Sequence, residues 1–355
     1  MKQVKICAFI LGVLLLLSAM AGCKQPSGGQ PVDGVQSAVN FAYFDTVSYV
    51  YSYAGDPVES FNERSAGVSR ILQEYHQLFD IYHEYSGINN LCTVNKQAGG
   101  DPVPVDPKLI QFMLYAKELY ETTGGEMNIM MGAVLSIWHE YRTYAMDNPG
   151  KGQVPPMEDL QEAAAHTDIS LLEIDETNNT LRITDPKASI DVGAVGKGYA
   201  TEQAAQYLEQ DKAFGYVLSI GANIRIIGTK PDGSSWLTGI RNPFGEGGHV
   251  AILNLSDISC VTSGSYERYY TVGNTRYHHI IDGDTLMPAA YFPSVSILTK
   301  DSGLADALST ALFCMPYEEG LQLANSLDGV EVLWVFEDGS IHCTDGLKDW
   351  LVDNP

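Results

Sequence analysis

The segment of this chain best suited to chemistry is a glycine-punctuated turn, SIDVGAVGKGYA at residues 189–200. Glycines let backbone N–H groups approach a ligand, and a helix N-terminus favours an anion. Lys197 adds a positive charge at the same point. Gly198 stands where a Walker A loop carries Ser or Thr, and the first glycine of that motif is missing, so this is a different kind of turn. Spacing alone supports two interpretations equally, a phosphate-binding turn or a tight turn with a surface lysine.

A second candidate is the sequence ADALST at residues 305–310. On a helix, Asp306 and Thr310 lie four residues apart and share one face. A carboxylate and a hydroxyl placed in this way suit a hard cation such as magnesium. The plainer interpretation is that Asp306 caps the helix and that Thr310 lines the core.

Two adjacent histidines, His278 and His279, form the third candidate. Neighbouring side chains on a strand point to opposite faces, so the pair cannot chelate a metal in a simple way. We expect one of them to be structural, while the other could be a general base near neutral pH, although an isolated histidine more often has no catalytic role. Together the turn, the oxygen pair and the histidine indicate metal-assisted chemistry on a phosphate ester or anhydride.

At these residues the chain resembles the ApbE family of FAD:protein FMN transferases. The similarity extends over about residues 41–345, and the motifs occur in the family's order. They are FDT at 44–46, FDIY at 79–82, TGGEMN at 123–128, IDVGAVGKGYA at 190–200, SGSYER at 263–268, HHIID at 278–282 and DALST at 306–310.

The resemblance implies a role for individual residues. Magnesium would be held by the backbone carbonyl of Ala194 and the side chains of Asp306 and Thr310. With Lys197, Asp306 and His279 as catalytic groups, a threonine hydroxyl of a partner protein would attack the FMN phosphorus, AMP would leave, and His279 would take the proton. FAD, the substrate, would contact Phe44, Tyr82, Glu126, Met127, Asn128, Asp191, Lys197, His279 and Ile280.

The chain departs from the family pattern at Met127-Asn128, where relatives usually carry Phe-Asp, and after the HHIID block, which continues GDTLMP. A magnesium-dependent FAD pyrophosphatase, in which water replaces the acceptor, would use the same residues. A flavin-binding lipoprotein without turnover is a further alternative, and a structural adhesin or solute-binding lipoprotein is a more distant one.

The N-terminal residues have the features of an export signal. Lys2 and Lys5 precede an apolar run at 6–17 that is too short to span a membrane, and the run ends in Met-Ala-Gly-Cys at Cys23. This pattern resembles a bacterial lipobox; the alternative is an ordinary signal peptide with an incidental cysteine. We therefore expect a signal peptide at 1–22, a lipid on Cys23, a flexible tether at 23–40 and a flavin transferase domain at 41–350.

This arrangement implies a location on the extracytoplasmic face of a bacterial membrane, with exported flavin proteins of membrane electron transport as acceptors. The formal net charge of −23, from 44 acidic and 21 basic residues, argues against electrostatic binding of nucleic acid or an anionic membrane. Anionic ligands could still bind at a local cationic site. Four further cysteines, with spacings that match no metal or redox motif, leave open whether any of them pair: Cys92, Cys260, Cys314 and Cys343.

Residue patterns predict strands and helices interspersed without a regular βαβ repeat. We therefore expect an α+β fold with a largely antiparallel sheet, consistent with the T-fold-like arrangement that the resemblance implies. Helices are predicted at 68–79, 106–124, 201–208, 305–313 and 320–326. Strands are predicted at 41–53, 171–174, 181–183, 216–220, 224–228, 250–255, 295–298 and 330–336.

Overall fold

A computed structural model describes residues 35–40, 43–53, 55–245 and 247–352 of the chain. Contacts divide the chain into two units, residues 1–35 and 36–355. The predicted signal peptide, Cys23 and the first part of the predicted tether lie outside the described residues. The last six residues of that tether form a strand, β1 (Val35–Asn40), so regular structure begins before the predicted boundary at residue 41.

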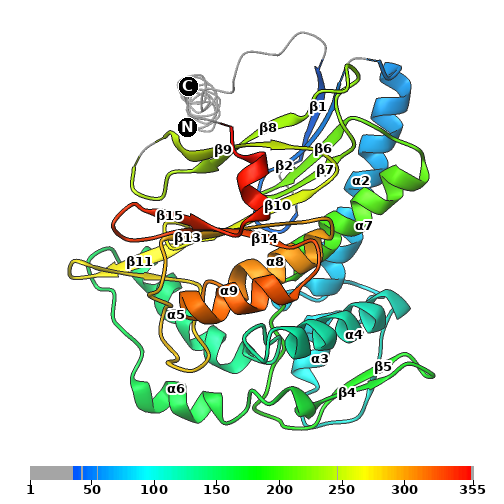
Figure 1. Cartoon of the computed structure of the whole chain (residues 1–355). Coiled ribbons are helices and arrows are strands. Elements are labelled where there is room, and N and C mark those ends of the chain that lie inside the picture. The colour runs from blue at the N-terminus through cyan, green and yellow to red at the C-terminus, as the bar shows by residue number, and fades with distance from the viewer. Residues whose placement is uncertain (1–34, 41–42, 54, 246, 353–355) are drawn as a thin grey trace, which may run out of the picture. The chain divides into compact units, whose positions relative to one another are not determined.

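One large sheet organises the second unit (Figure 1). Its eight strands lie in the order β1-β2-β6-β7-β10-β13-β14-β15, and every neighbouring pair from β2 onward is antiparallel. This confirms the predicted α+β class with a largely antiparallel sheet. After β1, the strands are β2 (Ser48–Tyr53), β6 (Tyr216–Ile220), β7 (Asn223–Ile227), β10 (Ser259–Gly264), β13 (Ser294–Thr299), β14 (Glu331–Val335) and β15 (Ile341–Cys343).

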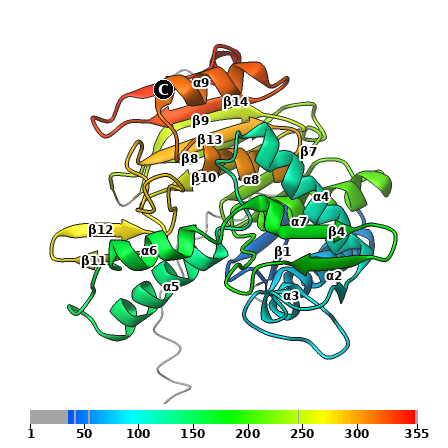
Figure 2. The ribbon, with the colours of Figure 1, turned by 90° about the horizontal axis from the view of Figure 1, so that it is seen from below.

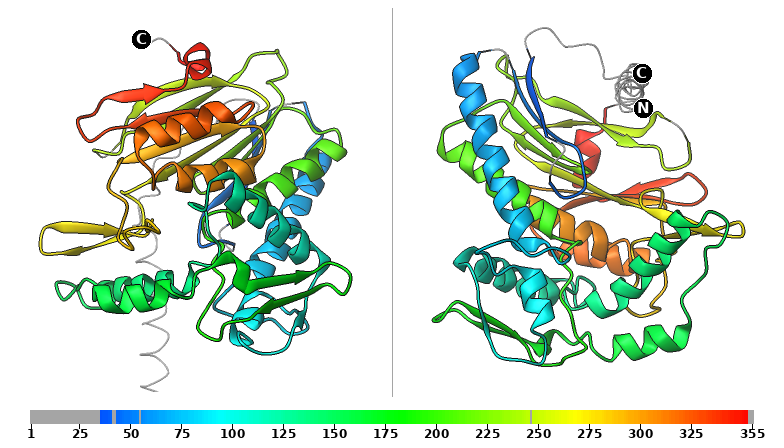
Figure 3. Two further views of the ribbon diagram at one scale, coloured as in Figure 1. Left: turned by 60° about the horizontal axis from the view of Figure 1, so that its bottom comes forward. Right: turned by 180° about the vertical axis from the view of Figure 1, so that it is seen from behind.

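Both faces of this sheet are covered, which explains why all six residues of β13 are buried. Figures 1 and 3 show helices along one face and the β8–β9 hairpin over the other. The helices on the first face are α2 (Val58–Phe79), α7 (Gly196–Gln210), α8 (Ser302–Ala311) and α9 (Tyr317–Ser326). The hairpin consists of β8 (Trp236–Arg241) and β9 (His249–Leu255), and its inner side chains share a small core with those of β7, β10 and β14.

Smaller elements extend from the helical side. A three-stranded sheet packs beside helices α3 (Leu91–Lys96) and α4 (Pro107–Thr122); its strands are β3 (Val103–Pro104), β4 (Leu172–Asp175) and β5 (Thr180–Ile183). Figure 2 shows α5 and α6 beside the β11–β12 hairpin. These four elements are α5 (Gly132–Asp147), α6 (Met157–Ala164), β11 (Tyr269–Val272) and β12 (Thr275–His278); two short 3₁₀ turns span Ile169–Leu171 and Gly346–Trp350.

Helices α7 and α8 approach each other closely at Gly198. A Cβ atom placed on Gly198 would lie 2.2 Å from the carbonyl oxygen of Ser302 and 2.4 Å from Cβ of Asp306. The Gly198 N–H also donates a 2.7 Å hydrogen bond to Oδ2 of Asp306. The missing side chain is therefore what brings these two motifs into contact.

A buried ion network fixes α7 to the sheet. The fully buried guanidinium of Arg225, on β7, pairs with Glu202 at 3.3 Å and with Glu209 at 2.7 Å, both on α7. Glu202 also accepts the N–H of Ser302 at the start of α8. Because the guanidinium has several carboxylate partners, its burial is compensated, and α7, β7 and α8 are held in one arrangement.

The structure differs from the predicted elements mainly at their ends. Helix α7 begins at Gly196 and not at residue 201, so Lys197 and Gly198 belong to its first turn. Asp301 caps α8 by accepting the N–H groups of Gly303 and Leu304, so the interpretation of Asp306 as the helix cap is wrong. Helices α3, α5 and α6 and strands β3, β8, β10, β11 and β15 were not predicted, and β1 lies in the predicted tether.

We expect Gly198→Ala to destabilise the protein by about 2 kcal/mol, because the added methyl group overpacks the α7–α8 contact. The higher helix propensity of alanine would offset only about 1 kcal/mol of the steric cost. The free energy of unfolding from urea denaturation measures this change. Gly245→Ala is the control, since a Cβ there meets nothing within 4 Å. Equal stability of the two variants would contradict the steric role of Gly198.

Candidate active site

The phosphate-binding turn and the Asp306 helix meet at the α7–α8 contact. Nζ of Lys197 lies 3.8 Å from Oδ2 of Asp306, the oxygen that also accepts the Gly198 N–H. Burial raises the pKa of Asp306, while Lys197 and the Gly198 N–H act to lower it. Lys197 is therefore a partly buried cation beside a buried carboxylate, which favours the phosphate-binding interpretation of the turn over a surface lysine.

The residues implied for magnesium have the right chemistry for a shared ligand set. Asp306 supplies a buried carboxylate, Thr310 follows one turn later on α8, and Ala194 lies in the turn that leads into α7. The described residues contain no group of three His, Cys, Asp or Glu side chains that could hold a metal. Magnesium is commonly bound by one or two carboxylates together with substrate phosphates and water, so this donor set fits the ion once substrate is present.

The two histidines have different environments, as predicted. His278 ends β12, its Nε2 lies 2.9 Å from the Ala289 carbonyl, and its Nδ1 accepts the N–H of Ile280. His278 is therefore a structural residue that carries its proton on Nε2. The Nδ1 atom of His279 is buried and has no hydrogen-bond partner in the described part of the chain. Burial, with the charges of Arg268, Lys197 and Arg142, lowers the pKa of His279 to about 3, so its ring is neutral.

Tyr82 lies at the edge of this cationic region. The Asp80 side chain, at the end of α2, accepts the backbone N–H of Tyr82 at 2.7 Å and so fixes the turn that carries it. Tyr82 is 56 % exposed, and its ring packs at a tilt of 33° against the ring of His139 from α5, with 5.2 Å between the ring centroids. Charges of Asp191 and Arg142 act on the Tyr82 hydroxyl, so these side chains lie around one site.

Asp191 is held in the turn before α7. Its Oδ1 accepts the Gly193 N–H at 2.8 Å. Burial raises the pKa of Asp191, whereas this hydrogen bond and the charges of His139 and Arg142 lower it. The structure thus associates Asp191 with Tyr82, and Lys197 with His279 and Asp306.

Three of the residues predicted to contact FAD have side chains that pack in the core or form hydrogen bonds within the protein. Met127 and Ile280 are almost fully buried in the main core. The Asn128 amide donates to the Thr167 carbonyl at 2.8 Å and accepts the Met130 N–H at 2.8 Å. Because these side chains stabilise their own loops, only backbone atoms of Met127 and Ile280 remain for a ligand.

Two other residues predicted to contact FAD, Phe44 and Glu126, lie in different surroundings, one beside an aromatic ring and the other among acidic side chains. Phe44 has a positive φ of 56° and its ring packs at 5.6 Å against that of His76. Such a φ is uncommon for a residue other than glycine and is often found at functional turns. Glu126 lies in an acidic group, where burial and then the charges of Asp284 and Asp282 raise its pKa to about 7.

The sequence motifs did not indicate the contribution of α5. Arg142 and His139 face Tyr82 and Asp191, yet both lie outside the motifs that carried the resemblance. A possible signal was their spacing of three residues, which places them on one helix face. Trp138 fixes this helix by donating from Nε1 to the Leu286 carbonyl at 2.9 Å.

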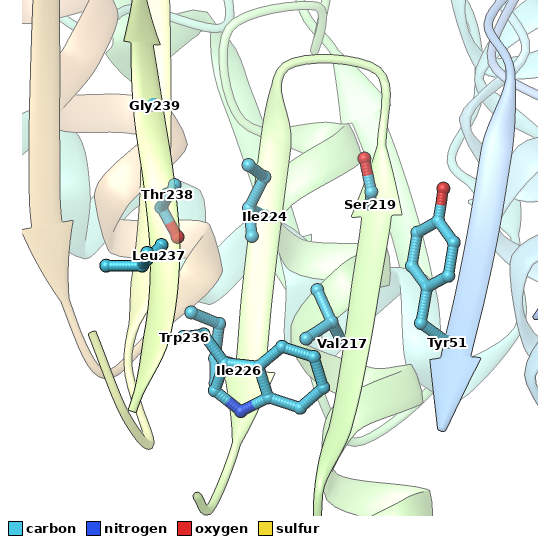
Figure 4. Close-up of a pocket in the computed structure, with 9 residues that line it drawn as sticks. All are labelled: Tyr51, Val217, Ser219, Ile224, Ile226, Trp236, Leu237, Thr238 and Gly239. Carbon is cyan, nitrogen blue, oxygen red and sulfur yellow. The ribbon is translucent and has the colours of Figure 1, made fainter. Parts of the chain in front are cut away.

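A cavity of about 230 Å³ lies elsewhere, on the far face of the sheet (Figure 4). Strands β2, β6 and β7 form its floor, β8 closes one side, and it is lined by Tyr51, Val217, Ser219, Ile224, Ile226, Trp236, Leu237, Thr238 and Gly239. None of the predicted site residues lines it, so it is separate from the Lys197–Asp306 site. The four cysteines of the described chain are free thiols, three of them buried.

Comparison with known proteins shows the family. The sequence profile of the ApbE family matches residues 45–334. This chain belongs to the ApbE family. It is 30 % identical over 319 residues to the FAD:protein FMN transferase of Treponema pallidum, which covers 86 % of this chain and 85 % of the relative. Another FAD:protein FMN transferase, from Klebsiella pneumoniae, is 26 % identical, with coverage of 82 % and 91 %.

Solved structures of ApbE proteins share the fold. The ApbE protein of Thermotoga maritima superposes with a TM-score of 0.78 at 26 % identity, covering 90 % of this chain and all of that one. The flavin transferase ApbE of Vibrio cholerae superposes with a TM-score of 0.73 at 24 % identity and supports the fold alone. The described part of this ApbE chain contains no helix that is long and apolar enough to cross a membrane.

The raised pKa of Glu126 predicts a pH-dependent stability. The folded protein binds this proton more tightly than the unfolded chain, so Glu126 lowers stability as pH rises from about 4.5 towards 7. Glu126→Gln should therefore raise the free energy of unfolding by about 1 kcal/mol more at pH 8 than at pH 4, a figure reduced for solvent screening. Urea denaturation at both pH values measures the difference. Glu121→Gln makes the same change at an exposed position of α4, and an equal response from it would contradict the prediction.

Proposed function

We propose that this protein transfers FMN from FAD to a threonine side chain of an acceptor protein, in a magnesium-dependent reaction that releases AMP. The observation that carries the proposal is the meeting of Lys197 and Asp306 at the first turn of α7, beside a buried His279 whose Nδ1 has no partner in the described residues, in a chain of the ApbE family. Relatives named FAD:protein FMN transferase support the reaction class.

The α7 turn is suited to hold the diphosphate of FAD. The first N–H groups of a helix and a lysine together attract an anion, and the buried surroundings strengthen that attraction. Asp306, Thr310 and the Ala194 carbonyl would hold magnesium, which when bound neutralises charge on the phosphate oxygens. The Lys197 side chain, 3.8 Å from Asp306, would stabilise the negative charge that develops on the leaving AMP phosphate.

His279 is placed to receive the proton of the attacking hydroxyl. Its neutral ring has an available lone pair, and no protein group competes for Nδ1 in the described chain. The threonine Oγ forms a new bond to the FMN phosphorus, the bond from that phosphorus to the AMP oxygen breaks, and His279 takes the hydroxyl proton. Positioning and charge stabilisation supply most of the rate in such a transfer.

The test incubates the detergent-solubilised chain with FAD, magnesium and a flavin-acceptor protein. We expect a fluorescent acceptor band on a denaturing gel together with stoichiometric AMP. AMP and free FMN without a labelled acceptor would indicate the pyrophosphatase alternative. Tight FAD binding with no AMP would indicate a binding protein without turnover.

Single substitutions test the individual roles. His279→Gln should lower the transfer rate by about 10²-fold to 10⁴-fold, because the proton acceptor is lost. Asp306→Asn should lower it by about 10²-fold or more through loss of charge stabilisation at the metal. Denaturation curves matched to the parent protein exclude misfolding. Full activity of Asp306→Asn would refute the metal assignment.

We also propose that Cys23 carries a lipid that holds the enzyme on the extracytoplasmic face of a bacterial membrane. The basic residues, short apolar run and Met-Ala-Gly-Cys sequence support this, and lipid anchoring does not depend on the protein's charge. Its acceptors would then be exported flavin proteins of membrane electron transport.

Cys23→Ala should move the protein from the membrane fraction to the soluble or precursor fraction. A cysteine without an acyl chain cannot anchor the chain in the bilayer. Cell fractionation followed by immunoblotting measures the distribution, with Cys343→Ala as the control cysteine. Membrane retention of the Cys23→Ala protein in processed form would contradict the proposal.

A further inference from the structure

Two arginines beside the site lack carboxylate partners. The charges of Arg268, Lys197 and Arg142 all act on the His279 ring. Lys197 lies near Asp306, but Arg142 and Arg268 form no ion pair anywhere in the described chain. Four of the eight arginines form no ion pair among the described residues, and Arg142 and Arg268 are the two of these whose charges act on His279.

The positive charges of Arg142 and Arg268 also repel each other. After burial, the charge of Arg268 is the largest influence that lowers the pKa of Arg142. The groups that act in the opposite direction are Tyr82 and Asp191, and Asp191 does not come within ion-pair distance of Arg142. Two like charges without a carboxylate at ion-pair distance repel each other, so a bound anion would relieve this repulsion.

Arg142 is held in a defined orientation. Its Nη2 lies 3.0 Å from Nδ1 of His139, one turn earlier on α5. A guanidinium can only donate, so Nδ1 of His139 is the acceptor and the imidazole proton is on Nε2. The other N–H groups of Arg142 have no hydrogen-bond partner among the described residues.

We propose that Arg142, oriented by His139 and assisted by Arg268, binds a phosphate group of the dinucleotide substrate and positions it beside His279. The inference rests on the proposed function for the identity of the substrate. A planar guanidinium with free N–H groups matches phosphate oxygens in two-point contacts, and the adjacent arginine adds charge. Arg142 is thus a binding residue, contributed by a helix outside the family motifs.

The experiment compares equilibrium binding of FAD and of ADP to the full-length chain in detergent, with magnesium present and no acceptor. Arg142→Gln should weaken both ligands by about tenfold to a hundredfold, because a charge-assisted contact to phosphate is lost. Binding should also become less sensitive to salt, since one cation has been removed. Arg142→Lys should restore part of the affinity, as it keeps the charge and loses the planar fork.

Two further variants distinguish a direct effect of the Arg142 charge on the phosphate from an indirect effect through Tyr82. His139→Phe keeps an aromatic ring beside Tyr82 but removes Nδ1, the atom that orients Arg142 and lies 3.4 Å from the Tyr82 hydroxyl; we expect weaker binding of ADP as well as of FAD. Arg182→Gln removes an arginine that pairs with Glu173 on the three-stranded sheet, and it should bind both ligands like the parent. An indirect role through Tyr82 would weaken FAD but leave ADP and the salt dependence unchanged.

The outcomes are distinct from those of the transfer assay. Parent-like affinity of Arg142→Gln for FAD and ADP, or an effect confined to the KM of the acceptor protein, would overturn the inference and leave the proposed function standing. Arg142-dependent binding of both nucleotides in a protein that transfers no FMN would support the inference and refute the function.

Discussion

The contact between α7 and α8 is the constraint on which the site depends. Gly198 lets the backbone of α7 approach the Ser302 carbonyl and the Asp306 side chain more closely than any larger residue would permit. The same glycine donates its N–H to Asp306, so packing and hydrogen bonding act at one point. Because Lys197 precedes Gly198, this contact also places the lysine beside the carboxylate. Two segments more than a hundred residues apart thereby form one site.

The surrounding fold keeps that contact in place. Arg225, buried in the sheet, pairs with Glu202 and Glu209 on α7, and Glu202 accepts the N–H of Ser302 at the start of α8. Asp301 caps the same helix end. Leaving any of these charges buried without its partner would cost several kcal/mol, about 3–5 in comparable cases, so the arrangement of α7, β7 and α8 is strongly determined.

The distribution of charge matters more than its total. The protein is strongly acidic, yet Lys197, Arg142 and Arg268 converge on one histidine. Among these cations His279 stays neutral and Asp306 pairs with Lys197. Glu126 lies instead beside Asp284 and Asp282, which together with burial raise its pKa. A local cationic site in an acidic body can attract an anionic nucleotide without general attraction for polyanions.

Local signals predicted much of the fold correctly. Asp106 caps α4 as its Asp-Pro sequence predicted, because capping involves neighbouring residues only. The 171–183 hairpin and β6 were also predicted correctly, because alternation of apolar and polar residues indicates a strand with one buried face. The start of α7 was misplaced because glycines are poor helix formers in isolation, and here packing against α8 overrides that preference.

The sequence by itself determined the α+β class, the family resemblance and the chemical types at Lys197, His279, Asp306 and Thr310. Only the tertiary structure decided which histidine is structural, that Asp301 and not Asp306 caps α8, and that Met127 and Asn128 serve their own loop. It also added Arg142 and His139 to the site. The reason is physical: motifs report residue types and local spacing, whereas burial, hydrogen-bond partners and the sum of nearby charges arise from segments far apart in the chain.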